Sequence, residues 1–278
     1  MKSKTKSDLT TTSDCRLPTS DCRLSTVDFR LKTLLDEKVE LFNTVKFIEN
    51  DPISIPHRFS LKEDREMSGF LTAIIAWGNR KSIITSANKM VEAMDGKPFD
   101  FVKDFSEKDL ISSKKFVHRT CNAFDFEYFL YSLKNIYQSH GGLENVFNTG
   151  YKLHGDMKNA IIYFRSVFLE LPYLPRTSRH ISNPEQNSAA KRINMFLRWM
   201  VRNDNKGVDF GIWNQIPASA LYCPLDVHSG NVSRNLGILK RKQNDWKAVE
   251  ELTSKLRKFD PNDPVKYDFA LFGMGVNL

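Results

Sequence analysis

The 278-residue sequence predicts an all-α protein, and three observations lead to this fold class. Apolar residues recur at helical spacing through most of the chain, and residues that favour helix starts precede several of these stretches. Runs that alternate apolar and polar residues, which are typical of half-buried strands, are not apparent. Because 41% of the residues are apolar, we expect a sizeable core in one globular domain of two lobes, over residues 28–278.

The first 27 residues differ from the remainder of the chain. A seven-residue unit at residues 12–18 (TSDCRLP) recurs at 19–25 and, in a weaker form, at 26–32. Polar and turn-forming residues dominate each unit, so no packed helical face results. We therefore expect residues 1–27 to be a disordered extension.

The predicted helices follow one another from about residue 31. The first covers residues 31–42, and a loop at 50–56 separates it from the second. The second begins at a capping box, in which Ser60 and Glu63 satisfy each other's free amide groups, and ends at Gly78. Further stripes predict helices over residues 83–94, 124–137, 157–170 and 191–202, near 226–236, and over 245–259 and 263–273. Turns are expected at residues 140–142 and 148–150, and a long loop at 171–187.

Composition limits the class of partner. The net charge of +8 favours an anionic partner, with nucleic acid first. The longest apolar runs are far shorter than the roughly 20 residues that span a bilayer, so we expect no membrane segment. The N-terminus lacks the apolar stretch of a signal peptide, and the cytoplasm is the expected compartment. The four cysteines and six histidines are scattered, so neither a metal site nor another cofactor is predicted.

Two residues are the candidates for chemistry. Lys191 belongs to the first turn of a predicted helix, with Ser188 as the expected N-cap. The helix dipole disfavours a cation there, and an amine that loses its proton can act as a nucleophile. Asp226 follows Pro224-Leu225 and is the expected N-cap of the next helix, where a carboxylate could also stabilise a developing cation. The sequence is also compatible with a solvated lysine at Lys191 and a purely structural N-cap at Asp226.

Basic and aromatic residues surround these two candidates in the sequence. Residues 176–206 hold seven basic side chains against two acidic ones, and we expect phosphates to dock there. Ile193 and Phe196 mark the core face of the helix, which places Arg198 and Arg202 on its other side. The expected nucleic-acid-binding residues are Arg192, Arg198, Arg202, His228, Arg234, Trp77, Asn79 and Arg80.

Five segments resemble those of an uncharacterised bacterial family of domains of unknown function. They are residues 52–57 (PISIPH), 76–81 (AWGNRK), 191–202, 224–228 (PLDVH) and 259–273. The resemblance runs from about Leu31 to the C-terminus and implies no activity.

The order of a helix-opening lysine, then Pro-x-Asp-x-His, then a helix ending near Gly237 is more distantly similar to helix-hairpin-helix DNA glycosylases. The archaeal 8-oxoguanine glycosylases are the nearest branch. This similarity implies a two-lobed helical fold, DNA as the partner, and base-excision repair of a flipped base. It implies that Lys191 forms a Schiff base with the sugar and that Asp226 stabilises the cationic transition state. Residues 187–190 stand where the hairpin glycines of that family would be.

These observations predict a DNA glycosylase and abasic-site lyase that needs no cofactor. The alternative from another class is a non-catalytic helical module that binds nucleic acid or a protein, so enzymatic activity stays open. A short distance between Lys191 and Asp226 in one pocket is the feature that would favour the enzyme.

Overall fold

A computed structural model describes residues 24–276, and within them the chain is mostly helical, which confirms the all-α prediction. The α-helices are α1 (Thr26–Phe42), α2 (Lys62–Ile74), α3 (Arg80–Ala93), α4 (Pro98–Asp104), α5 (Ala123–Ser139), α6 (Leu143–His154), α7 (Met157–Phe168), α8 (Lys191–Val201), α9 (Val227–Asn235), α10 (Trp246–Phe259) and α11 (Tyr267–Val276). Short 3₁₀ turns lie at Val45–Asn50, Pro52–Ser54, Pro56–Arg58, Asp109–Ile111, Ser113–Lys115, Thr177–His180, Pro184–Gln186, Ala218–Ala220 and Pro264–Lys266.

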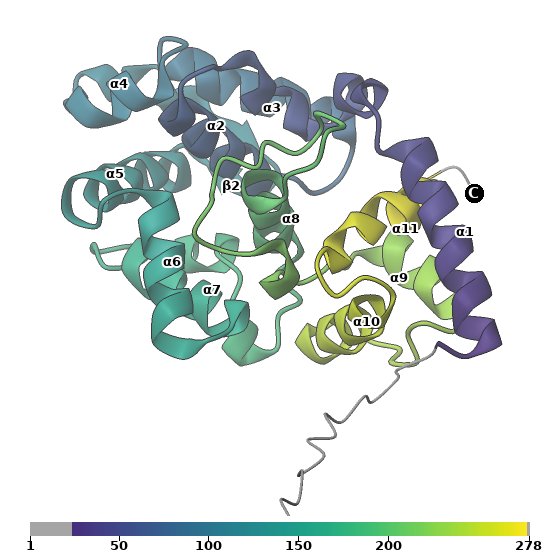
Figure 1. The fold of residues 1–278 in the computed structure, drawn as a ribbon. Helices are drawn as coiled ribbons and strands as arrows, with labels where there is room; N and C mark the ends of the chain where they lie inside the picture. The colour runs from purple at the N-terminus through teal and green to yellow at the C-terminus, as the bar shows by residue number, and fades with distance from the viewer. Residues whose placement is uncertain (1–23, 277–278) are drawn as a thin grey trace, which may run out of the picture.

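The helices form two groups with α8 between them (Figure 1). The first group holds α2 to α7, in which α6 and α7 pack closely as a helical hairpin and α2 packs on α8. The second group holds α1 and the C-terminal helices, because α1 packs along α11, which also contacts α9. Most of the predicted N-terminal extension lies outside the described residues, and α1 begins at Thr26.

Aromatic side chains fill the core of the first group and hold α8 in place. Phe147 of α6 stacks on Phe164 of α7 with ring centroids 4.3 Å apart. Phe196 of α8 meets Phe70 of α2 edge to face at 5.6 Å. Because buried aromatic pairs add to the free energy of burial, these contacts fix the position of α8 against the first group.

The predicted capping box at the start of α2 is wrong. The N-cap of α2 is Leu61, whose side chain makes no capping hydrogen bond, so the helix starts one residue later than a box at Ser60 requires. Glu63 lies in the first turn instead, where a carboxylate is favoured by the helix dipole.

Two other expectations about secondary structure fail locally. Residues 148–150 are not a turn, because α6 runs through them. Gly150 permits close packing there, since a Cβ atom on it would lie 2.9 Å from the Cα atom of Ala160 in α7. The chain also contains one small antiparallel hairpin, in which β1 (Val117–His118) pairs with β2 (Cys121–Asn122). Short strands of two residues leave too little alternation to be detected from sequence.

Candidate functional site

The start of α8 brings Lys191 to a precise position through an unusual backbone. Ala190 is the N-cap of α8 and has a left-handed conformation, with φ of 46°. This conformation costs a residue with a Cβ about 1 kcal/mol or more. Lys191 is therefore the first helical residue, which confirms its predicted place in the first turn but shows that the predicted N-cap is wrong. The predicted N-cap, Ser188, lies further out, and its Oγ accepts a hydrogen bond from the Ala190 amide at 3.3 Å.

Asp226 is the N-cap of α9, which confirms its predicted structural role. Its Oδ1 accepts a hydrogen bond from the Ser229 amide at 3.0 Å, and the Ser229 hydroxyl accepts one from the Asp226 amide at 3.0 Å. This reciprocal pair fixes the carboxylate rotamer. The second carboxylate oxygen, Oδ2, faces Lys191.

Lys191 and Asp226 meet in a cavity between the two groups of helices. The Lys191 Nζ atom lies 3.8 Å from Asp226 Oδ2, and both side chains are about one-quarter exposed. The Nζ atom also lies 3.6 Å from the sulfur of Met195. The cavity has a volume of about 760 Å³, which is within the usual range for ligand sites. Its walls come from the α2–α3 connection, α8, the start of α9, and α11.

Two buried acids that the sequence did not single out also line the cavity. Asp268 of α11 is 6% exposed, and its burial raises the pKa of its carboxyl to about 6, with a further rise from Asp226 and opposition from Arg198. Asp51 is 7% exposed, and burial raises its pKa as well. An acid inside the apolar run of residues 267–272 was the available sequence signal for Asp268.

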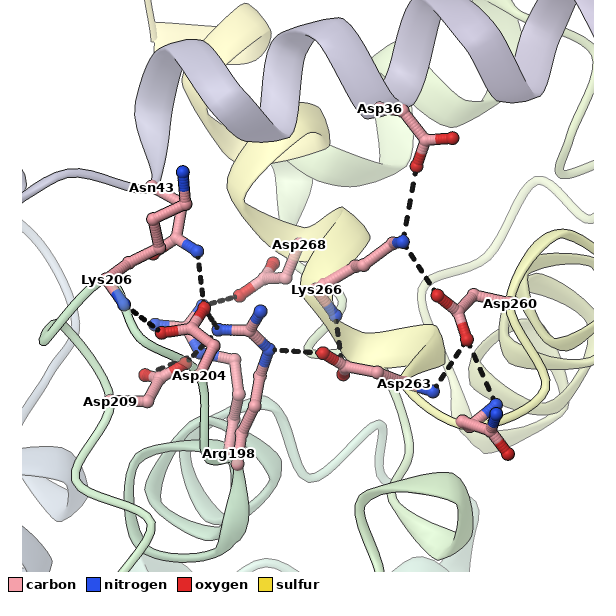
Figure 2. A network of polar contacts seen from close by, with 12 residues as sticks. Asp36, Asn43, Arg198, Asp204, Lys206, Asp209, Asp260, Asp263, Lys266 and Asp268 are labelled. Carbon is pink, nitrogen blue, oxygen red and sulfur yellow. Dashed lines mark hydrogen bonds and ion pairs between the residues drawn. The ribbon is translucent and has the colours of Figure 1, made fainter.

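Arg198 lies in a buried network of ion pairs (Figure 2), and Arg202 pairs with acids of the same network, so neither lies on a solvent-facing side of α8. Arg198 donates from Nε to Asp209 at 3.2 Å and from Nη1 to Asp268. Arg202 pairs with Asp204, Asp209 and Asp263 at 2.7, 3.1 and 2.8 Å. Each arginine is 3% exposed. The prediction that these two arginines lie on an accessible side of α8 is thus wrong, because both groups of helices cover α8.

Arg198 still reaches the cavity, whereas Arg202 is not among its lining residues. The Arg198 guanidinium pairs with Asp268, which also lines the cavity, and with Asp209. A phosphate would have to displace these carboxylates to bind either arginine.

Trp77 lines the cavity and contacts the side chains of Arg192 and His180. The Arg192 guanidinium lies 4.7 Å from the Trp77 ring centroid and donates to the Ile74 carbonyl. The ring of His180 stacks on Trp77 at 6.1 Å. Burial lowers the pKa of Arg192 to about 10. Trp77 is half-buried, so part of its ring faces the cavity.

Of the other four predicted binding residues, three line the cavity and one does not. Asn79 caps α3 by accepting from the Ser82 amide at 3.2 Å, and Arg80 lies 4.7 Å from the ring centroid of Phe272. His228 is exposed, with Nδ1 3.1 Å from the Gly275 carbonyl oxygen. These three line the cavity. Arg234 does not, and it donates instead to the Arg241 carbonyl and to Asn244.

One group of possible metal ligands lies behind Trp77. Atoms of Cys121, Asp125 and His180 come within 4.8 Å of one another, and all three residues are buried. The Asp125 oxygens are already engaged by Arg176 at 2.9 Å and by the Thr177 hydroxyl at 2.8 Å. Burial raises the pKa of the Cys121 thiol to about 12. The Asp125 carboxylate is thus paired within the described residues, and the cluster forms part of a buried structural network.

Within residues 24–276, no helix combines the length and apolar character needed to cross a membrane.

Comparison with known families supports the expected resemblance to an uncharacterised family. The family model described as "Protein of unknown function (DUF2400)" matches residues 51–277, which include Lys191, Asp226 and every other lining residue of the cavity except Phe47. No curated protein matches the chain significantly. The same holds for solved structures.

Proposed function

The chain belongs to the family described as Protein of unknown function (DUF2400), and for this chain we propose the activity of a DNA glycosylase and abasic-site lyase. The single observation that carries the proposal is the 3.8 Å approach of Lys191 Nζ to Asp226 Oδ2 in one cavity. An amine nucleophile and a carboxylate that faces it are the two groups that this reaction needs.

The reaction assigns a separate role to each group. The Lys191 Nζ lone pair forms a bond to C1′ of the deoxyribose as the bond from C1′ to the base breaks, and the base leaves with that electron pair and with the proton that the bonded amine gives up. The Asp226 carboxylate stabilises the positive charge that develops on the sugar. Opening of the sugar ring, with a proton taken up by O4′, leaves an iminium between Nζ and C1′, and loss of a C2′ proton to water expels the 3′ phosphate and cuts the strand. Water then hydrolyses the iminium and releases Lys191.

The fixed rotamer of Asp226 supports this division of roles. Oδ1 is occupied by the cap of α9, whereas Oδ2 faces the amine. A carboxylate that needs no reorientation during the reaction stabilises developing charge more effectively than a mobile one.

The wall at Trp77 supports a nucleobase as the group that enters the cavity. The Trp77 ring contacts Arg192 and His180 and lines the cavity, so it offers a positioned aromatic surface against which a flipped base can pack. The cations Arg192 and Arg80 at the same wall suit a polyanionic substrate.

An incision assay tests the proposal. Duplexes that contain an abasic site or 8-oxoguanine are incubated with the wild type, with Lys191→Ala, and with Lys258→Ala, which removes an exposed lysine of α10. We expect cleavage at the modified site by the wild type and by Lys258→Ala, and none by Lys191→Ala. Tight, salt-dependent binding without cleavage by any variant would instead identify a non-catalytic nucleic-acid-binding module.

A further inference from the structure

The hairpin between β1 and β2 carries an arginine in a conformation that arginine rarely adopts. Arg119 and Thr120 form the two-residue turn, and Arg119 has φ of 56°. Two-residue hairpin turns prefer Asn, Asp or Gly where φ is positive. A left-handed conformation at Arg119 costs about 1 kcal/mol. The Arg119 guanidinium forms no ion pair within residues 24–276, so no ion pair there offsets this cost.

The guanidinium of Arg119 lies against Gly78, a residue that lines the cavity. A Cβ atom built on Gly78 would come within 2.8 Å of Arg119 Nη1 and 2.9 Å of Cζ, so the guanidinium rests against the Gly78 backbone. Gly78 itself lines the cavity, next to Trp77. Arg119 is exposed and therefore presents its charge to solvent beside Gly78.

Three contacts hold the hairpin rigidly in this place. Arg176 donates to the Thr120 carbonyl at 2.6 Å, His118 Nδ1 lies 2.9 Å from the Ser86 hydroxyl of α3, and the His118 ring meets Trp77 edge to face at 5.4 Å. The hairpin tip is thus fixed relative to the Trp77 wall. A preorganised cation loses less conformational freedom on binding than one on a mobile loop.

The charges around Arg119 point to an anion. Lys81 follows Arg80 in the first turn of α3 and is exposed, and neither of them takes part in an ion pair among the described residues. Gly78 is thus contacted by Arg119 and followed in the chain by Arg80 and Lys81, three cations that have no ion-pair partner among the described residues. A planar guanidinium binds the oxygens of a phosphodiester with two parallel hydrogen bonds.

We propose that Arg119 binds a backbone phosphate beside the nucleotide whose base enters the cavity. This inference rests on the proposed function, since it takes DNA as the ligand, and it adds a contact that positions the strand. Phosphate contacts of this kind fix the register of a protein on the duplex without reading its sequence.

Arg119→Gly tests the contact without a penalty to the fold. Glycine adopts positive φ readily, so this variant removes the cation and relieves the backbone at once. The matched control is Arg30→Ala, which removes one exposed arginine from α1 in the second group. The probe is a duplex with a tetrahydrofuran abasic analogue, which cannot form an iminium, and the dissociation constant is measured at several salt concentrations.

We expect Arg119→Gly to bind the duplex about tenfold more weakly, with a melting temperature equal to or above that of the wild type. The slope of the logarithm of affinity against the logarithm of salt concentration should decrease by about one, whereas Arg30→Ala should retain the wild-type slope.

Two results would overturn the inference, and they differ in what they imply for the proposed function. Wild-type affinity and slope in Arg119→Gly, together with normal cleavage of abasic DNA, would reject the phosphate contact alone. Absence of duplex binding by the wild type would reject both. A weakened Arg119→Gly in a protein that cleaves no DNA would support the contact and reject the lyase.

Discussion

Lys191 Nζ lies 3.8 Å from Asp226 Oδ2, and the two residues come from the first turn of α8 and the N-cap of α9. The two helices are held by different groups, since the aromatic core of the first group holds α8, whereas α9 packs on α11 in the second group. The pair is therefore assembled by tertiary structure. Its geometry makes separate predictions for the charge and for the cap of Asp226.

Asp226→Asn separates catalysis from capping. Asparagine caps helices about as well as aspartate, so we expect the free energy of unfolding to change by less than about 0.5 kcal/mol. Loss of the negative charge should slow base release about 100-fold under single-turnover conditions. Asp226→Ala is the companion variant, which should lose about 1 kcal/mol of stability as well. Wild-type base release by Asp226→Asn would contradict a role for the carboxylate.

Trp77→Ala should weaken binding of a damaged base more than binding of the backbone. In a Lys191→Ala background, which leaves the base attached, we expect about 10- to 100-fold lower affinity for a duplex with 8-oxoguanine, because stacking on the ring is lost. Trp77→Phe should retain most of the affinity. The abasic-analogue duplex is the control, since it has no base to stack. Equal losses on both duplexes would mean that Trp77 acts only through the fold.

Arg202→Gln should destabilise the fold without a direct effect on DNA binding. The substitution leaves the buried Asp209 and its neighbours Asp204 and Asp263 without their shared cation. We expect a loss of about 3–5 kcal/mol in urea unfolding. Arg30→Ala, at an exposed position, should change stability by less than about 0.5 kcal/mol. Unchanged stability with weaker DNA binding would instead show that Arg202 contacts DNA directly.

Asp268 should make stability depend on pH in a definite direction. Burial raises the pKa of its carboxyl to about 6 in the folded protein, above its ordinary value of 3.8. Between these values the folded state holds more protons than the unfolded state, so the free energy of unfolding falls as the pH rises, and levels off above the folded pKa.

The difference in unfolding free energy between the wild type and Asp268→Asn isolates this effect. It should decrease by about 2–3 kcal/mol from about pH 4 to about pH 7. Urea unfolding of both proteins at several pH values measures it. A difference that is constant or that increases with pH would contradict the raised pKa.

Much of the fold was predictable because local signals determine it. The periodicity of α8 and α10 and the caps at Asp226 and Asp245 depend on neighbouring residues, and α9 and α10 begin where the sequence indicates, whereas α8 begins two residues later than a cap at Ser188 requires. The start of α2 was missed because both Ser60 and Leu61 precede a good first turn, and the pattern does not choose between them.

The site was only partly predictable because burial is decided by distant partners. An amphipathic pattern identifies the core face of α8, but it cannot show that a second group of helices covers Arg198 and Arg202 on the opposite face. Asp51 and Asp268 were missed for the same reason. Arg119 gave no sequence signal, because its position depends on a two-residue turn that packs against Gly78.

The most direct test of the central claim is chemical trapping of the Lys191 intermediate. The wild-type protein is incubated with abasic-site DNA and borohydride, which reduces an iminium to a stable amine, and the cross-linked peptide is identified by mass spectrometry. We predict one covalent adduct, on Lys191, that Lys191→Ala abolishes and Lys258→Ala retains. An adduct on another residue, or no adduct from a protein that binds the DNA, would contradict the covalent mechanism.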